Sequence, residues 1–290
     1  AVARQLEGFL RQCPPGMGIQ WRVGLELGLR LISWAFIAEF LRGSDVLTPA
    51  LGRDLLASAD AHMAWLERYP SLYSSANNHR LGELAGLVVG GLAFPELPRA
   101  QERYQLGMDG LCAELDAQTH PDGVNAEQAV YYHQFVLDLL VATTAVVVRA
   151  GRPVPDGLAR PLKAMADVAG TLASDSGSLP AIGDNDDAVA IDLASGADDV
   201  TRLRSRLRTV SVLVGEPTAR LDPGLDEQFV WLCGAEASAR PLPERRPGSA
   251  VFPAGGLVVL RRRDDAVGEL RAVLRAGPFG LAPIYAHAHA

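Results

Sequence analysis

The stretch QWRVGLELGLRLISWAFIAEFLR, residues 20–42, decides the fold class. Its large apolar side chains recur at steps of three and four residues, the period of a helix with a wide buried face. Gly43 and Ser44 follow and are expected to end the helix. We therefore expect the chain to build its core from helices. The residues that set the period are Trp21, Leu25, Leu29, Ile32, Phe36 and Phe40.

Further helices are predicted along most of the chain, separated by clusters of Gly, Pro, Asn and Ser. Almost no strand-type alternation occurs before Ala239. Helix pairs of similar length joined by short loops suit a bundle, a solenoid or a helical toroid, and the pattern alone does not separate these. The predicted ranges are 51–69, 80–92, 98–119, 126–150, 157–172, 198–214 and 225–236.

The composition changes at residues 240–248, where Pro, Arg and Glu predict a connecting segment. After it, residues 256–261 and 269–275 are short β-branched and Leu-rich runs joined by a charged turn, which predicts a hairpin. Helices followed by strands indicate an α-helical domain and then the start of a β domain. About forty residues make too small a core for that second domain to be stable alone.

Charge and composition exclude several classes of protein. The chain has 27 basic and 34 acidic residues, a net charge of −7, and only one lysine, Lys163, so nucleic acid is an unexpected partner. Three distant cysteines give neither a disulfide framework nor a Cys-based metal site. Apolar runs such as 31–40 and 137–148 are shorter than a membrane span. Because the chain starts at Ala1 and stops at Ala290, we interpret it as part of a longer protein.

The segment Ser74–His79 is the most polar interruption of the helical pattern, with Glu83 one turn further on. Ser and Asn at a helix start commonly cap it by accepting hydrogen bonds from free backbone N–H groups. Two consecutive amides, Asn77 and Asn78, beside the imidazole of His79 are more polar than a cap requires. An amide beside an imidazole could bind and neutralise a substrate carboxylate, so we favour a site over a cap alone.

A second polar cluster, Asp122–His133, is expected to begin with a turn at Asp122-Gly123 and to continue as a helix. A tyrosine on such a helix either packs with its hydroxyl at the rim or exchanges protons, if neighbouring groups lower its pKa. Both interpretations stay open. The sets of residues that would share a helical face are Glu127, Tyr131 and Gln134, and Gln128, Tyr132 and Phe135.

Two further motifs carry polar chemistry. The acidic loop Gly183–Asp187 could hold a hard cation, but it lacks the spacing of a calcium-binding hand, so a solvated turn or a loop lining a cleft is favoured. Near the end of the chain, His287 and His289 would lie on one face of a strand. Such a pair fits two ligands of one zinc ion, one ligand beside a catalytic base, or two histidines at a rim.

Together these motifs resemble the heparinase II/III-like polysaccharide lyases along nearly the whole chain. Each motif is loose alone, but their order and spacing are fairly specific in combination. The matching stretches are Trp21–Arg30, Asn77–Glu83, Asp122–Gly123 with Glu127–Gln128 and Tyr132–His133, Ile182–Asp186, Gly277–Pro278 and His287–His289.

The resemblance implies a mainly α fold, with an (α/α) toroid of helical hairpins over residues 1–240. The start of a C-terminal β-sandwich would follow over residues 249–290, where only its first strands are present. Family members cleave uronic-acid-containing polysaccharides by β-elimination, which removes the C5 proton, breaks the bond to the 4-oxygen and leaves an unsaturated sugar. The implied partner is an anionic polysaccharide or oligosaccharide, such as a glycosaminoglycan, an alginate-like polymer or a bacterial exopolysaccharide.

By motif match, Asn78 corresponds to the family's carboxylate-neutralising Asn, and His79 to the adjacent His that acts as a neutraliser or base. Tyr132 occupies the place of the Tyr that serves as the acid and, in some members, as both acid and base. His287 matches the first His of the C-terminal motif, which is used in catalysis. His289 matches a ligand of a structural zinc in some members, whose other ligands would lie beyond Ala290.

The resemblance implies no cofactor for catalysis, with the structural zinc belonging to the full-length protein. It also points to five residues that would bind substrate or line the cleft. One of them could instead form a plain structural ion pair with Glu26, one helical turn away. The five are Asn77, Glu83, Glu127, Gln128 and Arg30. Arg30 is the residue that could instead pair with Glu26.

Two other functions stay open from the sequence. The protein could bind glycans without catalysis, in bacterial polysaccharide assembly. Alternatively, Glu127 and Asp184 could form the acid/base pair of a glycoside hydrolase, since helical toroids also host these enzymes. The resemblance favours a bacterial protein in the periplasm or outside the cell, but the sequence does not fix its location.

Overall fold

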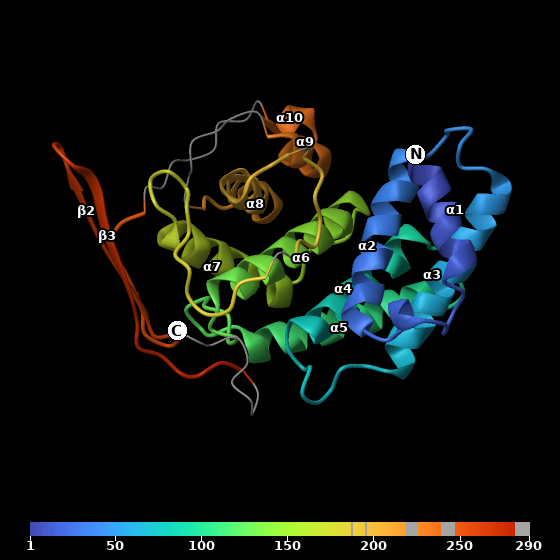
Figure 1. Cartoon of the computed structure of the whole chain (residues 1–290), viewed down its shortest axis with the longest axis horizontal. Helices are drawn as coiled ribbons and strands as arrows, with labels where there is room; N and C mark the ends of the chain where they lie inside the picture. The colour runs from blue at the N-terminus through green and yellow to red at the C-terminus, as the bar shows by residue number, and fades with distance from the viewer. Residues whose placement is uncertain (187, 195, 219–225, 239–246, 282–290) are drawn as a thin grey trace. The chain divides into compact units, whose positions relative to one another are not determined.

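The computed structural model describes residues 1–290 except 187, 195, 219–225, 239–246 and 282–290. Helices come first and an antiparallel sheet follows (Figure 1), which confirms the predicted fold class. The elements are α1 (Val2–Gln12), η1 (Ile19–Trp21), α2 (Gly24–Phe40), α3 (Pro49–Arg68), α4 (Asn78–Ala93), α5 (Ala100–Gln118), α6 (Val130–Arg149), α7 (Asp156–Leu172), α8 (Asp199–Val214), α9 (Glu227–Cys233), α10 (Ala235–Ser238), β1 (Ala250–Phe252), β2 (Leu257–Asp264) and β3 (Gly268–Arg275).

The chain forms two compact units. The first contains residues 1–114 and 149–152, and the second contains residues 115–148 and 153–290. Each unit has its own buried cluster of apolar side chains. The predicted domain boundary between residues 240 and 249 stays a prediction, because residues 239–246 lie outside the described part of the chain.

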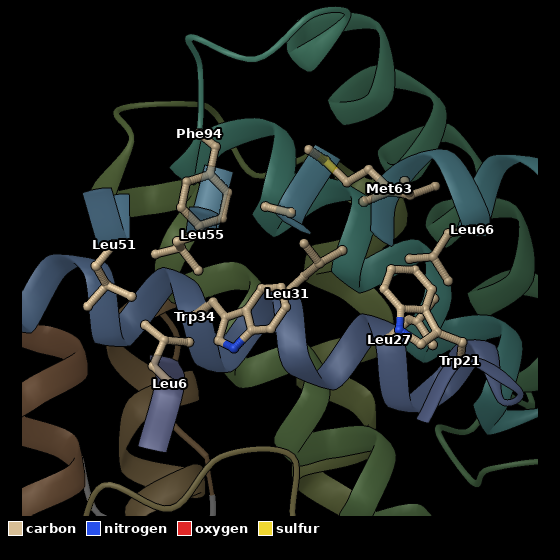
Figure 2. Close-up of a cluster of buried hydrophobic side chains, with 12 residues drawn as sticks. Leu6, Trp21, Leu27, Leu31, Trp34, Leu51, Leu55, Met63, Leu66 and Phe94 are labelled. Atoms are coloured by element: carbon tan, nitrogen blue, oxygen red, sulfur yellow. The ribbon is translucent and has the colours of Figure 1, made fainter. Parts of the chain in front are cut away.

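The core of the first unit is built on α2 (Figure 2). The predicted helix is confirmed, but its buried face is only partly the predicted one: Leu27 and Leu31 are fully buried, whereas Phe40 is 46% exposed. Trp21 and Trp34 enclose the imidazole of His62 from α3, with ring centroids 4.3 and 4.5 Å away. This aromatic cluster fixes α3 against α2.

Glycines explain why the buried face of α2 lies where it does. A Cβ added at Gly28 would overlap the carbonyl oxygen of Gly82, and one added at Gly86 would overlap the Cα of Gly28. The backbones of α2 and α4 therefore meet without intervening side chains. This contact turns the Leu27 side of α2 inward, and it depends on residues that an apolar periodicity does not count.

The second unit has α6 as its central helix. By length and composition α6 could cross a membrane, but 78% of its most apolar window is buried in the protein, as expected of a core helix. One carboxylate, Asp138, is fully buried in this apolar helix. It forms an ion pair of 2.9 Å with Arg206 of α8. The helix is therefore apolar around a single buried charge pair.

The predicted hairpin is confirmed as β2 and β3, and β1 extends it to three strands in the order β1-β2-β3. Leu257 and Val259 pack with Val168 and Leu172 of α7. The sequence pattern did not predict β1, which has only three residues, or α1, in which Leu6 is the buried residue.

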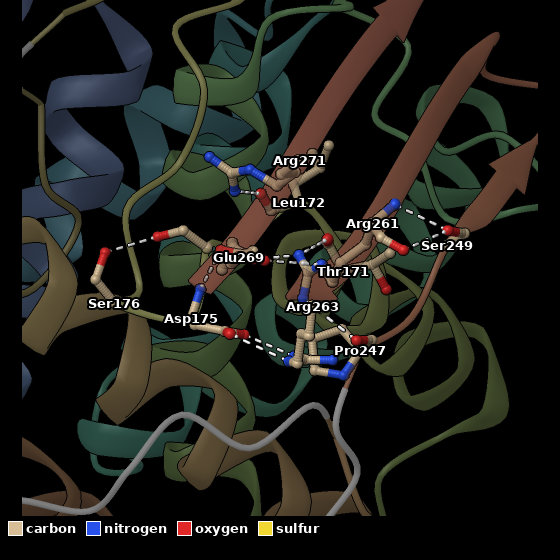
Figure 3. A network of polar contacts seen from close by, with 12 residues as sticks. Thr171, Leu172, Asp175, Ser176, Pro247, Ser249, Arg261, Arg263, Glu269 and Arg271 are labelled. Carbon is tan, nitrogen blue, oxygen red and sulfur yellow. Dashed lines mark hydrogen bonds and ion pairs between the residues drawn. The ribbon is translucent and has the colours of Figure 1, made fainter. Parts of the chain in front are cut away.

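Two arginines fasten the hairpin to the end of α7 (Figure 3). Arg261 and Arg271 lie opposite each other on β2 and β3, where like charges normally repel. Arg261 donates to the carbonyl oxygens of Thr171 and Ala173, and Arg271 donates to that of Leu172. The final carbonyls of a helix carry partial negative charge, so they offset this repulsion.

Replacing Gly28 with Ala should destabilise the first unit, because the new methyl group meets backbone atoms of α4 that cannot move aside. Overpacking of this kind costs about 1–3 kcal/mol in the free energy of unfolding. Gly52→Ala in α3 is the matched control, since its Cβ would meet nothing within 4 Å. It should stabilise the helix by up to about 1 kcal/mol. Urea unfolding of both variants measures the difference, and equal stability would contradict the close contact.

His62 should make the protein less stable in acid. Burial lowers the pKa of His62 from 6.5 to about 4, because its uncharged ring is enclosed by two indoles. The unfolded chain takes up this proton below pH 6.5 and the folded chain does not, so stability falls between pH 6.5 and 4. One such group contributes about 3 kcal/mol over this interval.

The variant His62→Phe should lose this share of the pH dependence while keeping an aromatic ring between Trp21 and Trp34. The measurement is the free energy of unfolding in urea at a series of pH values between 7 and 4. Parallel profiles for the two proteins would show that His62 titrates normally in the folded state.

Candidate functional site

The first group of candidate residues lies at the N-terminus of α4, in the first unit. The side chain of Asn77 accepts a hydrogen bond of 3.1 Å from the backbone N–H of His79, so the cap interpretation is confirmed for Asn77. Asn78 is 2% exposed, and His79 is half-buried. The structure thus places an amide and an imidazole at a helix start, where backbone N–H groups and the helix dipole favour an anion.

Glu83 follows within α4 and is 0% exposed. Its carboxylate accepts hydrogen bonds from the Ser71 N–H and hydroxyl, at 2.9 and 2.6 Å, and from Arg80 at 3.1 Å. Gly24 of α2 leaves the space that this carboxylate occupies. Glu83 was predicted to bind substrate or line the cleft. Its contacts tie the segment before α4 to the helix that carries Asn78 and His79, and the predicted role in binding stays a prediction.

Arg30 of α2 has the structural ion pair that the sequence allowed. Its guanidinium lies 3.7 Å from the carboxylate of Glu26 and donates to the carbonyl oxygens of Glu26 and Gln20. It also lies 5.3 Å from the centre of the Phe9 ring. These contacts hold the Arg30 side chain against α1 and η1, as well as against its own helix α2.

The second group of candidates lies in the second unit, where one expectation was wrong. Helix α6 begins at Val130, not at residue 126, so Glu127 and Gln128 do not share a helical face with the tyrosines. Asn125 causes the difference: its side chain accepts from the Glu127 N–H at 3.0 Å and stabilises a turn. Gln128 then adopts a left-handed backbone with φ 61°. Both Glu127 and Gln128 are at least 95% buried.

The turn before α6 is held by residues that the sequence did not single out. The His133 ring accepts from the Asn125 N–H and donates to the Met165 carbonyl oxygen at 2.9 Å, so it is neutral and its pKa is lowered to about 4 by burial. The predicted turn at Asp122-Gly123 is confirmed, with Gly123 at φ 90°. Asp122 also accepts from the N–H groups of Ala254 and Gly255, at 2.7 and 2.9 Å, and so binds the β1–β2 turn.

Tyr132 lies among acidic groups. Burial raises its pKa above the ordinary value of 10, and the charges of Asp186, Glu127 and Asp184 and a hydrogen bond with Asp186 raise it further. The interpretation of this tyrosine as a proton-exchanging group required a lowered pKa, whereas the environment in the structure raises the pKa. At neutral pH the phenol therefore keeps its proton, which suits an acid and not a base. Asp184 and Asp186 of the acidic loop therefore face this phenol, which agrees with one of the two interpretations favoured from sequence, a loop that lines a cleft.

A cavity of about 410 Å³ opens beside the acidic loop, within the range of ligand pockets. It lies between the start of α6, the segment 177–185 and the start of α8, and Tyr131 and Gln134 line one side. Asp184 and Asp198 line it as well. Carboxylates accept hydrogen bonds from sugar hydroxyls and repel anionic groups, so this lining suits the uncharged sugar units of a polymer better than its charged units.

Two predicted residues lie outside the described part of the chain: His287 and His289. Their proposed catalytic and zinc-binding roles stay predictions. Among the residues that the structure does describe, no group of three His, Cys, Asp or Glu side chains is arranged to hold a metal ion. Asn78 and His79 belong to the first unit and Tyr132 to the second, so each group is described by itself.

The model of the family described as heparinase II/III N-terminus matches residues 1–198. No curated protein matches the chain.

Solved structures match over nearly the whole chain. Heparan sulfate lyase HepC from Pedobacter heparinus has 18% identity and a TM-score of 0.63, with 98% of this chain and 41% of that chain covered. A structure of heparinase III has 18% identity and a TM-score of 0.67, with the same coverage. The chain thus spans about two fifths of these proteins. The likeness establishes the fold and confirms a helical toroid followed by the start of a β domain.

Removing the Glu83 carboxylate should destabilise the start of α4. Glu83→Gln leaves the mostly buried Arg80 guanidinium without its charged partner, a loss of about 3–5 kcal/mol for a buried pair. Ser71→Ala removes one hydroxyl donor and keeps the N–H contact, so it should cost about 1 kcal/mol. Urea unfolding compares the two, and equal losses would mean that the charge of Glu83 has no structural role.

Proposed function

This chain belongs to the heparinase II/III N-terminus family, and from that premise we propose that the protein is a polysaccharide lyase. Its substrate would be a uronic-acid-containing anionic polysaccharide, and its reaction a β-elimination across C4 and C5 of the uronate. The fold likeness to a heparan sulfate lyase and to heparinase III supports a glycosaminoglycan as the first substrate to test.

The chemical difficulty of the reaction is the weak acidity of a proton next to a carboxylate that keeps its charge. Preorganised donors around that carboxylate stabilise the anion that develops, at about 3–4 kcal/mol per donor. In the proposed mechanism Asn78 supplies such a donor, and His79 neutralises the carboxylate or removes the C5 proton. Their position at the N-terminus of α4 supports the role, because the helix dipole adds to the stabilisation.

The observation that carries the proposal furthest is the environment of Tyr132. A raised pKa keeps its phenol protonated, and in the proposed step the phenol donates that proton to the leaving 4-oxygen. An alkoxide leaving group is far more basic than a phenolate, so the transfer is downhill even from a weak acid. Three carboxylates around the phenol would favour its prompt reprotonation after each turnover.

We expect the full-length protein to form unsaturated products from heparan sulfate or another uronate polymer, measured by their ultraviolet absorbance. Tyr132→Phe should lower kcat by roughly 100-fold or more, the usual contribution of a general acid. Tyr69→Phe is the control, since this half-exposed tyrosine packs on Trp65 at the end of α3. In the wild-type protein, loss of the acid should reduce activity only above pH 10.

The products also separate the other candidate functions. Saturated reducing ends would identify a hydrolase, in which Glu127 and Asp184 replace the tyrosine as the catalytic pair. Binding without turnover, unchanged in Tyr132→Phe, would identify a glycan-binding protein. Full turnover by the Phe variant would remove Tyr132 from the mechanism.

A further inference from the structure

Asp138 is a buried charge that the proposed mechanism does not use. It lies on α6 two turns after Tyr131 and Tyr132 and is 0% exposed. Its Oδ1 accepts from Arg206 at 2.9 Å, and its Oδ2 accepts from the backbone N–H groups of Ala190 and Ile191, at 2.9 and 3.2 Å. A carboxylate in an apolar helix is tolerated only with partners of this kind.

The two N–H groups belong to the segment that carries the acidic loop. The beginning of that segment is tied to α6 by a hydrogen bond of 2.9 Å from the Val130 N–H to the Ile182 carbonyl oxygen. The Tyr131 hydroxyl donates to the carbonyl oxygen of Ala188. Asp138 holds the far end, at Ala190 and Ile191. The acidic loop is therefore fastened to α6 on both sides of Asp184 and Asp186.

We propose that Asp138 is a positioning residue: by holding Ala190 and Ile191 against α6, it keeps the Asp186 carboxylate on the phenol of Tyr132. Asp138 itself touches neither the phenol nor a substrate in this role. The inference rests on the proposed function only where it speaks of catalysis. Its structural part, the dependence of Tyr132 on Asp138, stands without it.

The charged groups that face the phenol are known from the described residues. Asp184 and Asp186 come from the acidic loop, and Glu127 comes from the turn before α6. Only the two aspartates depend on the fastening at Ala190 and Ile191, since Glu127 is held by Asn125. Releasing the loop should therefore move the titration of Tyr132 to lower pH, without abolishing the contribution of burial and of Glu127.

The test is Asp138→Asn in the full-length protein. The tyrosine rings carry carbon-13, and the Tyr132 signal is assigned by its absence in Tyr132→Phe. We expect the Tyr132 titration to shift to lower pH, and the amides of Ala190 and Ile191 to exchange with solvent faster by on the order of tenfold. Asp192→Asn is the matched control: it breaks an exposed ion pair with Arg202, next to Ile191, and should leave the titration unchanged.

Asp138→Asn also leaves Arg206 buried without a charge partner and could unfold the unit. Tyr131→Phe is the second variant, because it removes the hydrogen bond to Ala188 and keeps the ring. It should shift the Tyr132 titration in the same direction by a smaller amount. An unchanged titration in Tyr131→Phe would overturn the proposal if Asp138→Asn does not fold.

Activity separates this inference from the proposed function. If both hold, the alkaline limit of turnover moves to lower pH together with the Tyr132 titration. A shifted titration with an unshifted activity profile would support the positioning role and remove Tyr132 as the acid. Faster exchange at Ala190 and Ile191 with an unchanged Tyr132 titration would overturn the inference and leave Asp138 as a structural residue.

Discussion

A charged group that is removed from water must find partners, and in this chain that requirement ties loops to helices. Glu83 binds Ser71 and Arg80 and thereby fixes the segment before α4. Asp138 binds Arg206 and the backbone of residues 190–191. In each case one of the partners lies on an irregular segment, at Ser71 before α4 or at residues 190–191 between α7 and α8. The candidate residues are therefore held by polar contacts at the ends of helices, on a frame that apolar packing provides.

The frame could be predicted from the sequence because apolar periodicity is local. The helix over residues 20–42 and the hairpin over residues 256–275 were both expected, and both exist with small changes of boundary. The inward face of α2 was only partly expected. It depends on which helix lies against Gly28, and this is decided by Gly82 and Gly86 of α4, some fifty-five residues further along the chain.

The candidate site was less predictable, because its chemistry arises from residues distant in sequence. The start of α6 was placed too early, since a periodicity does not register that Asn125 turns the chain before Val130. The raised pKa of Tyr132 was not predicted, because two of the three carboxylates that act on it, Asp184 and Asp186, come from a loop more than fifty residues away. Asp138 left a usable signal: a lone carboxylate in an apolar helix needs a buried donor.

The pairing of Arg261 with Arg271 has a consequence for how the strand alignment is encoded. Within the β2–β3 ribbon, Arg261 pairs with Glu269 of β3 at 3.0 Å, whereas Arg271 donates to the carbonyl oxygens of Leu172 and Ser178 outside the ribbon. In this alignment both arginines also donate to carbonyl oxygens of the last turn of α7, about ninety residues earlier in the chain. The end of α7 thus adds acceptors that lie within reach of both arginines in this alignment, so the helix and the ribbon stabilise each other's position within the second unit.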